Sequence, residues 1–107
     1  MGRVWVVEYD SGAVLDLEDV KSKGDRKAVF HVVNKLGEFG PDLTSPHMKS
    51  LKGEADLFEL RPKRGSVAVR AIYARVGDRF VVLAVAATKP RFERAVGNAR
   101  ARLPRYR

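Results

Sequence analysis

Three runs rich in β-branched and aromatic residues follow one another between Leu57 and Ala86, and this arrangement most restricts the possible folds. They cover residues 57–61, 67–76 and 80–86, and turn signals at Gly65-Ser66 and Gly77-Asp78 separate them. Strands joined by tight turns run antiparallel. The sequence therefore predicts a mainly antiparallel sheet in the second half of the chain.

The first turn is expected to bring two arginines together. With residues 65–66 at its centre, Arg61 lies directly opposite Arg70. Like charges in such a pair destabilise a sheet, so we expect the pair to hold an anion, and phosphate is the best candidate. Pro62 cannot donate to a strand ladder. A longer loop over 62–66 would change the register but leave both arginines at the same end of the sheet.

The second turn adds a third cation to this end of the sheet. A two-residue turn at 77–78 pairs Arg70 with Val85. Side chains alternate along a strand, so the following residues are expected on the face of Arg70: Val81, Leu83, Val85, Ala87 and Lys89. Lys89 should therefore emerge beside Arg61 and Arg70.

The remaining elements complete an α+β domain. We expect a strand over 3–9, a short helix over 14–20 and a longer helix over 25–39, whose apolar residues recur at helical spacing. Residues 41–53 are expected to form a loop, and Pro90 to lie in the first turn of a basic closing helix. The order is β-α-α-β-β-β-α, with the two N-terminal helices packed on the sheet.

Composition places the chain in a narrow class. With 107 residues, of which 45% are hydrophobic, residues 1–107 should form one domain with a real core. The chain has no cysteine and two histidines far apart in sequence, so we expect no disulfide, no metal centre and no other cofactor. No apolar run approaches the roughly 20 residues of a membrane span, and no signal peptide is apparent, so a cytoplasmic location fits.

Charge is divided unevenly along the chain. Residues 1–60 carry eight Lys/Arg and eleven Asp/Glu, whereas residues 61–107 carry thirteen and two. This separation favours a polyanionic partner for the second half, over a basic protein that charge merely keeps soluble.

Residues 40–89 resemble the RelE superfamily of bacterial toxins, and within it the HigB or phage Gp49-like branch. The similarity lies in Gly-Pro-Asp-Leu at 40–43, Pro-His-Met-Lys-Ser-Leu-Lys-Gly at 46–53, Leu-Phe-Glu-Leu-Arg-Pro at 57–62 and Val-Arg-Ala-Ile-Tyr at 69–73. The resemblance implies a RelE-like fold and an mRNA-cleaving toxin that a cognate helix-turn-helix antitoxin neutralises and that often acts on the ribosome. It further implies attack of the ribose 2′-oxygen on the adjacent phosphate without a metal.

The resemblance also implies roles for individual residues. By position, Arg61, Arg70 and Lys89 match the basic catalytic cluster of the family. We expect the two arginines to clamp the scissile phosphate, because a guanidinium donates two hydrogen bonds to it. Lys89 would add positive charge or protonate the leaving oxygen. The candidate RNA-binding residues are Lys49, Lys52, Arg91 and Arg94. Solvated cations, some of them paired with Glu59 or Glu93, are the alternative.

Four aromatic or histidine residues are candidates either for the chemistry or for the core. Relatives often place a tyrosine or histidine late in the chain, and Tyr106 is the late candidate here. His47 is either a general base or an ordinary loop residue, so the general acid and base stay open. Tyr73 alternates with Arg70 onto the opposite face and is expected in the core, as is Trp5.

Other functions remain open at this point. A ParE-like toxin would inhibit DNA gyrase without cutting RNA. A non-enzymatic module would bind RNA in a salt-dependent way and form no product. A degenerate phage-derived protein would have neither activity.

Overall fold

The computed structural model describes residues 4–62 and 68–107. Its five strands form one sheet in the order β1-β5-β4-β3-β2, in which β1 runs parallel to β5 and the other neighbours are antiparallel. The strands are β1 (Val6–Tyr9), β2 (Met48–Ser50), β3 (Phe58–Leu60), β4 (Arg70–Val76) and β5 (Arg79–Ala86). The turn at 65–66 lies outside the described residues.

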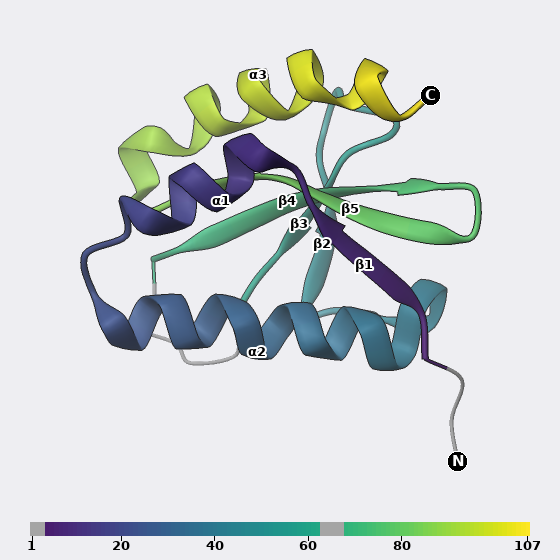
Figure 1. The fold of residues 1–107 in the computed structure, drawn as a ribbon, viewed down its shortest axis with the longest axis horizontal. Helices are drawn as coiled ribbons and strands as arrows, with labels where there is room; N and C mark the ends of the chain where they lie inside the picture. Colours follow the sequence, from purple (N-terminus) through teal and green to yellow (C-terminus); the bar gives the residue numbers. More distant parts are fainter. Residues whose placement is uncertain (1–3, 63–67) are drawn as a thin grey trace.

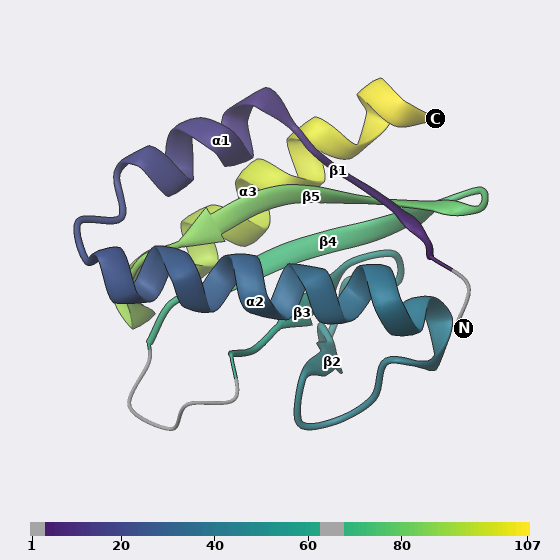
Figure 2. The ribbon, with the colours of Figure 1, turned by 60° about the horizontal axis from the view of Figure 1, so that its bottom comes forward.

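Three helices surround the sheet. They are α1 (Ser11–Glu18), α2 (Lys23–Phe39) and α3 (Phe92–Arg102), and α2 and α3 cover opposite faces of the sheet (Figures 1 and 2). Short 3-10 turns follow α2, precede α3 and close the chain: η1 (Gly40–Asp42), η2 (Lys89–Arg91) and η3 (Leu103–Tyr106). The predicted α+β architecture is confirmed. In the described residues, no helix is both long and apolar enough to cross a membrane.

Capping explains why the helices begin earlier than the periodicity indicates. Asp10 accepts a 2.7 Å hydrogen bond from the Gly12 N–H, so α1 begins at Ser11 rather than at residue 14. The Ser22 hydroxyl accepts from Asp25 in the same way and starts α2 at Lys23. The helix ends before Gly40, whose φ of +54° suits glycine.

The apolar side chains form two layers, one on each face of the sheet. On the α2 side, Val29, Val32 and Leu36 pack with Tyr73 and Phe80. Trp5 packs against this layer while staying partly exposed. The predicted core position of Tyr73 is thus confirmed, whereas Trp5 lies at the edge of the core. On the α3 side, a second layer joins the helix to β4 and β5 through Ala95, Val96, Ala99, Ile72 and Val81.

The predicted turn at 77–78 is present, but an irregularity changes the register beyond it. Val76 pairs with Arg79 as that turn requires, whereas Arg70 pairs with Ala86, so the predicted pairing with Val85 is wrong. Tyr73 pairs with Val82 and Ile72 with Ala84, which leaves Leu83 as the extra residue of a β-bulge. Arg102 of α3 donates a 2.8 Å hydrogen bond to the Leu83 carbonyl.

Because of the bulge, some side chains of β5 lie on the face of the sheet opposite to the predicted one. Val81 and Leu83 lie in the layer on the α3 side, which is the side of Ile72 and Arg70. Val85 and Ala87 belong to the layer on the α2 side, so their predicted placement beside Arg70 is wrong. The physical reason is the inserted residue, which reverses the alternation in the last part of the strand.

The segment predicted as a loop over 41–53 contains the extra strand β2. It is three residues long and pairs Lys49 with Glu59 and Met48 with Leu60. Helix α1 lies beside β5, where Val85 donates a 3.1 Å backbone hydrogen bond to the Asp16 carboxylate. Figure 2 shows α1 next to the part of β5 that extends beyond β1.

Candidate active site

A cavity of about 270 Å³ lies where strands β2 to β5 meet the start of α3. We call it the basic pocket. Its lining residues are Lys49, Glu59, Arg61, Ala68, Arg70, Thr88, Lys89, Phe92 and Glu93. Residues from widely separated parts of the sequence thus share one concave site, and the three predicted catalytic cations are among them.

The strands place charges of alternating sign in a row. Lys49 on β2 is directly opposite Glu59 on β3, and Glu59 is opposite Ile72 on β4. Arg70 lies two residues before Ile72 and therefore on the same face, as the diagonal neighbour of Glu59. The register Leu60–Ala71, continued by one residue, brings position 61 opposite position 70.

Lys89 reaches the basic pocket by a different route from the predicted one. β5 ends at Ala86, and Lys89 starts η2, with Pro90 in the first turn. The Arg91 N–H donates to the Thr88 carbonyl at 3.1 Å. Lys89 therefore lies in the pocket because the chain turns there, and strand alternation does not account for its position.

Arg70 forms the best-defined contacts in the basic pocket. Its Nε lies 3.3 Å from Oε1 of Glu59, and its Nη1 donates a 2.9 Å hydrogen bond to the Val69 carbonyl. The side chains of Arg70 and Glu59 are only 22% and 12% exposed. Arg70 therefore forms an ion pair with Glu59, which was the alternative to anion binding that the sequence left open. Within the described part of the chain, Lys49, Arg61 and Lys89 form no ion pair, and their charges stay available for a ligand.

The other predicted RNA contacts lie outside the lining of the basic pocket. Lys52 is exposed in the turn between β2 and β3, and Arg91 and Arg94 are exposed on η2 and α3. Arg91 and Arg94 lie within five residues of Lys89 along the chain. His47 is half-buried, and its carbonyl accepts a 2.8 Å hydrogen bond from the Arg61 N–H.

Tyr106 belongs to a different part of the molecule. Its hydroxyl donates a 2.6 Å hydrogen bond to Asp10. Desolvation by burial, together with this bond, raises the pKa of Tyr106 to about 12. The basic pocket adjoins the start of α3, whereas Tyr106 lies in η3, beyond the end of that helix. The late tyrosine of this chain is therefore a structural residue outside the pocket.

Sequence reasoning missed five residues as parts of the site: Glu59, Ala68, Thr88, Phe92 and Glu93. Glu59 and Glu93 were expected only as ion-pair partners. Strand alternation could have placed Glu59 on the face of Arg61, two residues further on, whereas its partner Lys49 follows only from the short strand β2. Phe92 has the helical spacing of a core residue, and it is partly buried at the first position of α3.

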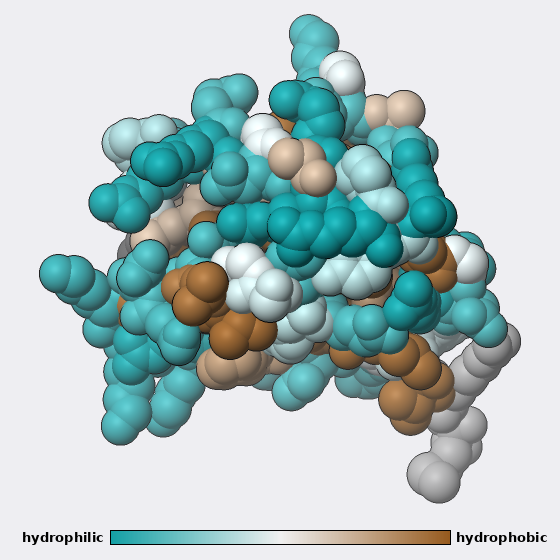
Figure 3. Space-filling model, turned by 45° about the horizontal axis from the view of Figure 1, so that its top comes forward, coloured by the Kyte–Doolittle hydropathy of each residue, from teal (hydrophilic) through white to brown (hydrophobic). Residues whose placement is uncertain are grey.

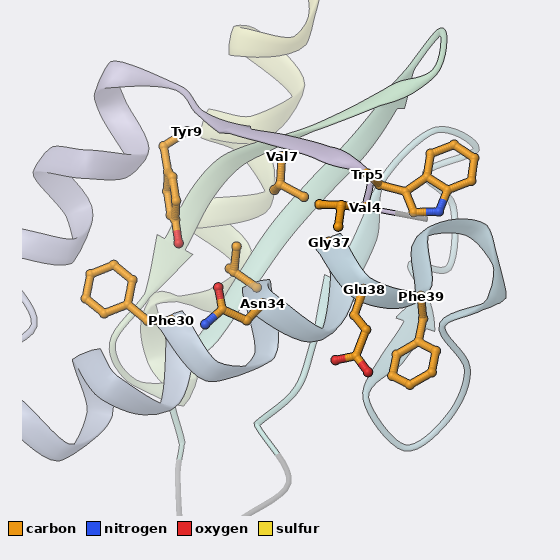
Figure 4. A pocket seen from close by; sticks show the side chains of 10 residues that line it. Val4, Trp5, Val7, Tyr9, Phe30, Asn34, Gly37, Glu38 and Phe39 are labelled. Atoms are coloured by element: carbon orange, nitrogen blue, oxygen red, sulfur yellow. The ribbon is translucent and has the colours of Figure 1, made fainter. Parts of the chain in front are cut away.

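A larger, apolar hollow of about 800 Å³ lies between β1 and α2 (Figure 4). Tyr9, Val7 and Trp5 line it from the strand side, and Phe30 and Phe39 from the helix. Its described lining contains no lysine or arginine, so it is unsuited to a phosphate. By contrast, the face that carries α1 and α3 is covered mainly by hydrophilic side chains (Figure 3).

Comparison with known proteins identifies the family and the fold of the chain. The model of the phage-derived protein Gp49-like family (DUF891) matches residues 17–96, about three quarters of the chain. The chain belongs to this family. It is therefore a Gp49-like member of the RelE superfamily of toxins, and the predicted membership is confirmed. RelE-like toxins are in general ribonucleases that pair with antitoxins.

A solved structure is similar over nearly the whole chain. It is the toxin RelE of E. coli, as a double arginine-to-alanine mutant in the free state. The TM-score is 0.71 at 16% sequence identity, and the similarity covers 94% of this chain and 98% of the other. No curated protein matches the chain by sequence. The similarity to RelE shows a common fold.

Proposed function

We propose that this protein is the toxin of a type II toxin–antitoxin pair and an endoribonuclease that cleaves mRNA without a metal ion. The observation that carries the proposal is the meeting of Lys49, Arg61, Arg70 and Lys89 in one small cavity. Four cations gathered around a concave site suit the phosphodiester of a single-stranded RNA.

Each cation has a task in phosphodiester cleavage. Arg61 and Arg70 bind the non-bridging oxygens of the scissile phosphate and stabilise the charge that grows there in the transition state. Lys89 donates a proton to the departing 5′-oxygen. Lys49 holds the flanking backbone in line for attack by the 2′-oxygen. Lys52, Arg91 and Arg94 around the pocket bind the more distant backbone and add affinity.

A cleavage assay tests the proposal. Purified protein is incubated with a defined mRNA, with and without ribosomes, and the products are mapped at nucleotide resolution. We expect cleavage by the wild type and a rate reduced by about 10²–10³-fold in Arg70→Ala. Lys27→Ala, which removes an exposed cation of α2, is the matched control and should keep the wild-type rate.

Absence of product in both settings would contradict the proposal. Loss of gyrase supercoiling in the same preparation would then support the ParE-like alternative. Salt-dependent RNA binding without any product would support the non-enzymatic RNA-binding module.

We further propose that the partner is a helix-turn-helix antitoxin and that cleavage takes place in the cytoplasm, on mRNA at the ribosome. Pairing of RelE-like toxins with antitoxins supports this proposal. Expression of the toxin alone should arrest growth, and Arg70→Ala should relieve the arrest. Co-expression of the antitoxin encoded beside the toxin should also restore growth, and failure to do so would contradict the pairing.

A further inference from the structure

A carboxylate such as that of Glu59 is not expected in a site that only binds phosphate. The Glu59 side chain is largely buried in the middle of β3, in the lining of the basic pocket. A carboxylate there repels a phosphodiester and weakens the binding of RNA. Its position between Lys49 on one strand and Arg70 on the next fixes it in the pocket.

The proposed reaction also lacks a proton acceptor. Attack by a 2′-hydroxyl requires a base, and arginine cannot be one because it stays protonated. Glu59 and Glu93 are the carboxylates in the described lining of the pocket. Glu93 is exposed on α3, whereas Glu59 is largely buried and oriented by the guanidinium of Arg70.

We infer that Glu59 is the general base that takes the proton from the attacking 2′-hydroxyl, an inference that rests on the proposed function. The bond from O2′ to phosphorus forms as the proton passes to the Glu59 carboxylate. The bond from phosphorus to O5′ breaks, and O5′ takes a proton from Lys89. The products are a 2′,3′-cyclic phosphate and a 5′-hydroxyl, and water returns both residues to their starting forms.

The ion pair with Arg70 links substrate binding to this step. An arriving phosphate competes with Glu59 for the guanidinium of Arg70, whose Nε lies 3.3 Å from the carboxylate. When the phosphate binds, the ion pair between Glu59 and Arg70 weakens. The carboxylate is then positioned beside the bound nucleotide. Removal of its charge should therefore stop the chemistry without weakening RNA binding.

The test compares Glu59→Gln with the wild type in two measurements. In single-turnover cleavage of an RNA that the wild type cuts, we expect the rate of Glu59→Gln to fall by about 10²–10⁴-fold. For the same RNA with a 2′-O-methyl group at the cleavage site, which cannot react, we expect equal or tighter binding. Glu38→Gln removes an exposed carboxylate from α2 as the matched control and should leave both values unchanged.

The dependence of rate on pH separates a base from a positioning residue. General-base catalysis predicts a wild-type rate that falls towards acidic pH, and the residual rate of Glu59→Gln should lose this acidic limb. Glu59→Asp, which keeps a carboxylate, should keep the limb at a reduced rate.

Three outcomes would overturn the inference. A wild-type cleavage rate in Glu59→Gln would exclude Glu59 as the base while leaving the proposed function intact. A parallel loss of RNA affinity and rate would show that Glu59 acts only by positioning Arg70. If the wild type cuts no RNA, with or without ribosomes, the proposed function and the inference fall together.

Discussion

The hydroxyl of Tyr106 donates a 2.6 Å hydrogen bond to Asp10, which connects the last turn of the chain to the start of α1. Asp10 is only 1% exposed and also accepts from the Gly12 N–H and from Arg105. Within the described residues, no buried side-chain polar atom lacks a partner. The carboxylate is thus fully satisfied, although burial of an unpaired charge would be costly.

Loss of the Tyr106 hydroxyl should affect stability and leave activity unchanged. Tyr106→Phe removes one donor from a buried carboxylate, and we expect the free energy of unfolding to fall by about 1–3 kcal/mol in urea denaturation. The cleavage rate should stay at the wild-type value, because Tyr106 lies outside the basic pocket. A large loss of rate in a folded variant would mean that the late tyrosine takes part in the chemistry after all.

The stability of the protein should depend on Asp10 at acidic pH. Burial by itself would raise the pKa of Asp10, but hydrogen bonds from Tyr106 and Gly12 and the charges of Arg105 and Arg102 outweigh it and lower the pKa. A group with a lowered pKa in the folded state stabilises the fold above its unfolded value of about 3.9, and this contribution is lost as the pH falls below that value.

Asp10→Asn provides the measurement for this dependence. The difference in unfolding free energy between wild type and variant should be constant from about pH 7 to pH 5 and should shrink between about pH 4 and the lower folded pKa. Urea denaturation at several pH values measures it. Parallel curves for the two proteins down to about pH 2, below the unfolded pKa, would contradict the assignment.

The exposed cations outside the basic pocket should contribute to affinity alone. Lys52→Ala and Arg94→Ala each remove one cation that we propose to bind the RNA backbone. The slope of log affinity for single-stranded RNA against log salt concentration should become less steep by about 0.7 for each phosphate that the variant no longer neutralises. The single-turnover rate at saturating RNA should not change. If the slope equals that of Lys27→Ala, the residue does not bind the backbone.

Two glycines with positive φ offer a matched pair for stability. A Cβ at Gly53, where φ is +81°, would meet no atom within 4 Å, so Gly53→Ala should lower stability by backbone strain alone, about 1–2 kcal/mol. A Cβ at Gly40 would collide with the indole ring of Trp5. Gly40→Ala should therefore cost about 1–3 kcal/mol more. Thermal unfolding of both variants measures the difference, and equal losses would show that the indole ring moves aside freely.

The strand pattern and turn residues were enough to predict much of this fold. Periodicity marks α2, and the glycine turn at 77–78 gives the hairpin of β4 and β5. The bulge at Leu83 could not be predicted, because its residues have the same composition as a regular strand and its carbonyl is satisfied by distant Arg102. The short strand β2 exists only through its pairing with β3, so local sequence carries little sign of it.

The sequence predicted part of the candidate site. The route by which one of its residues reaches the pocket was predicted wrongly. Arg61, Arg70 and Lys89 do converge, yet Lys89 arrives through the turn at Pro90. The carboxylate of Glu59 was not foreseen as a functional group. Its place between Lys49 and Arg70 depends on three strands at once, which no single segment of sequence reveals.

The bond from the Val85 amide to Asp16 has a consequence for self-association. β5 is longer than its neighbour β1, so part of its border would otherwise offer unpaired amides to a strand from another molecule. Helix α1 occupies that border, and fibril nucleation there requires α1 to detach first. Conditions that loosen α1, such as acid acting on Asp10, should therefore make concentrated solutions prone to aggregate.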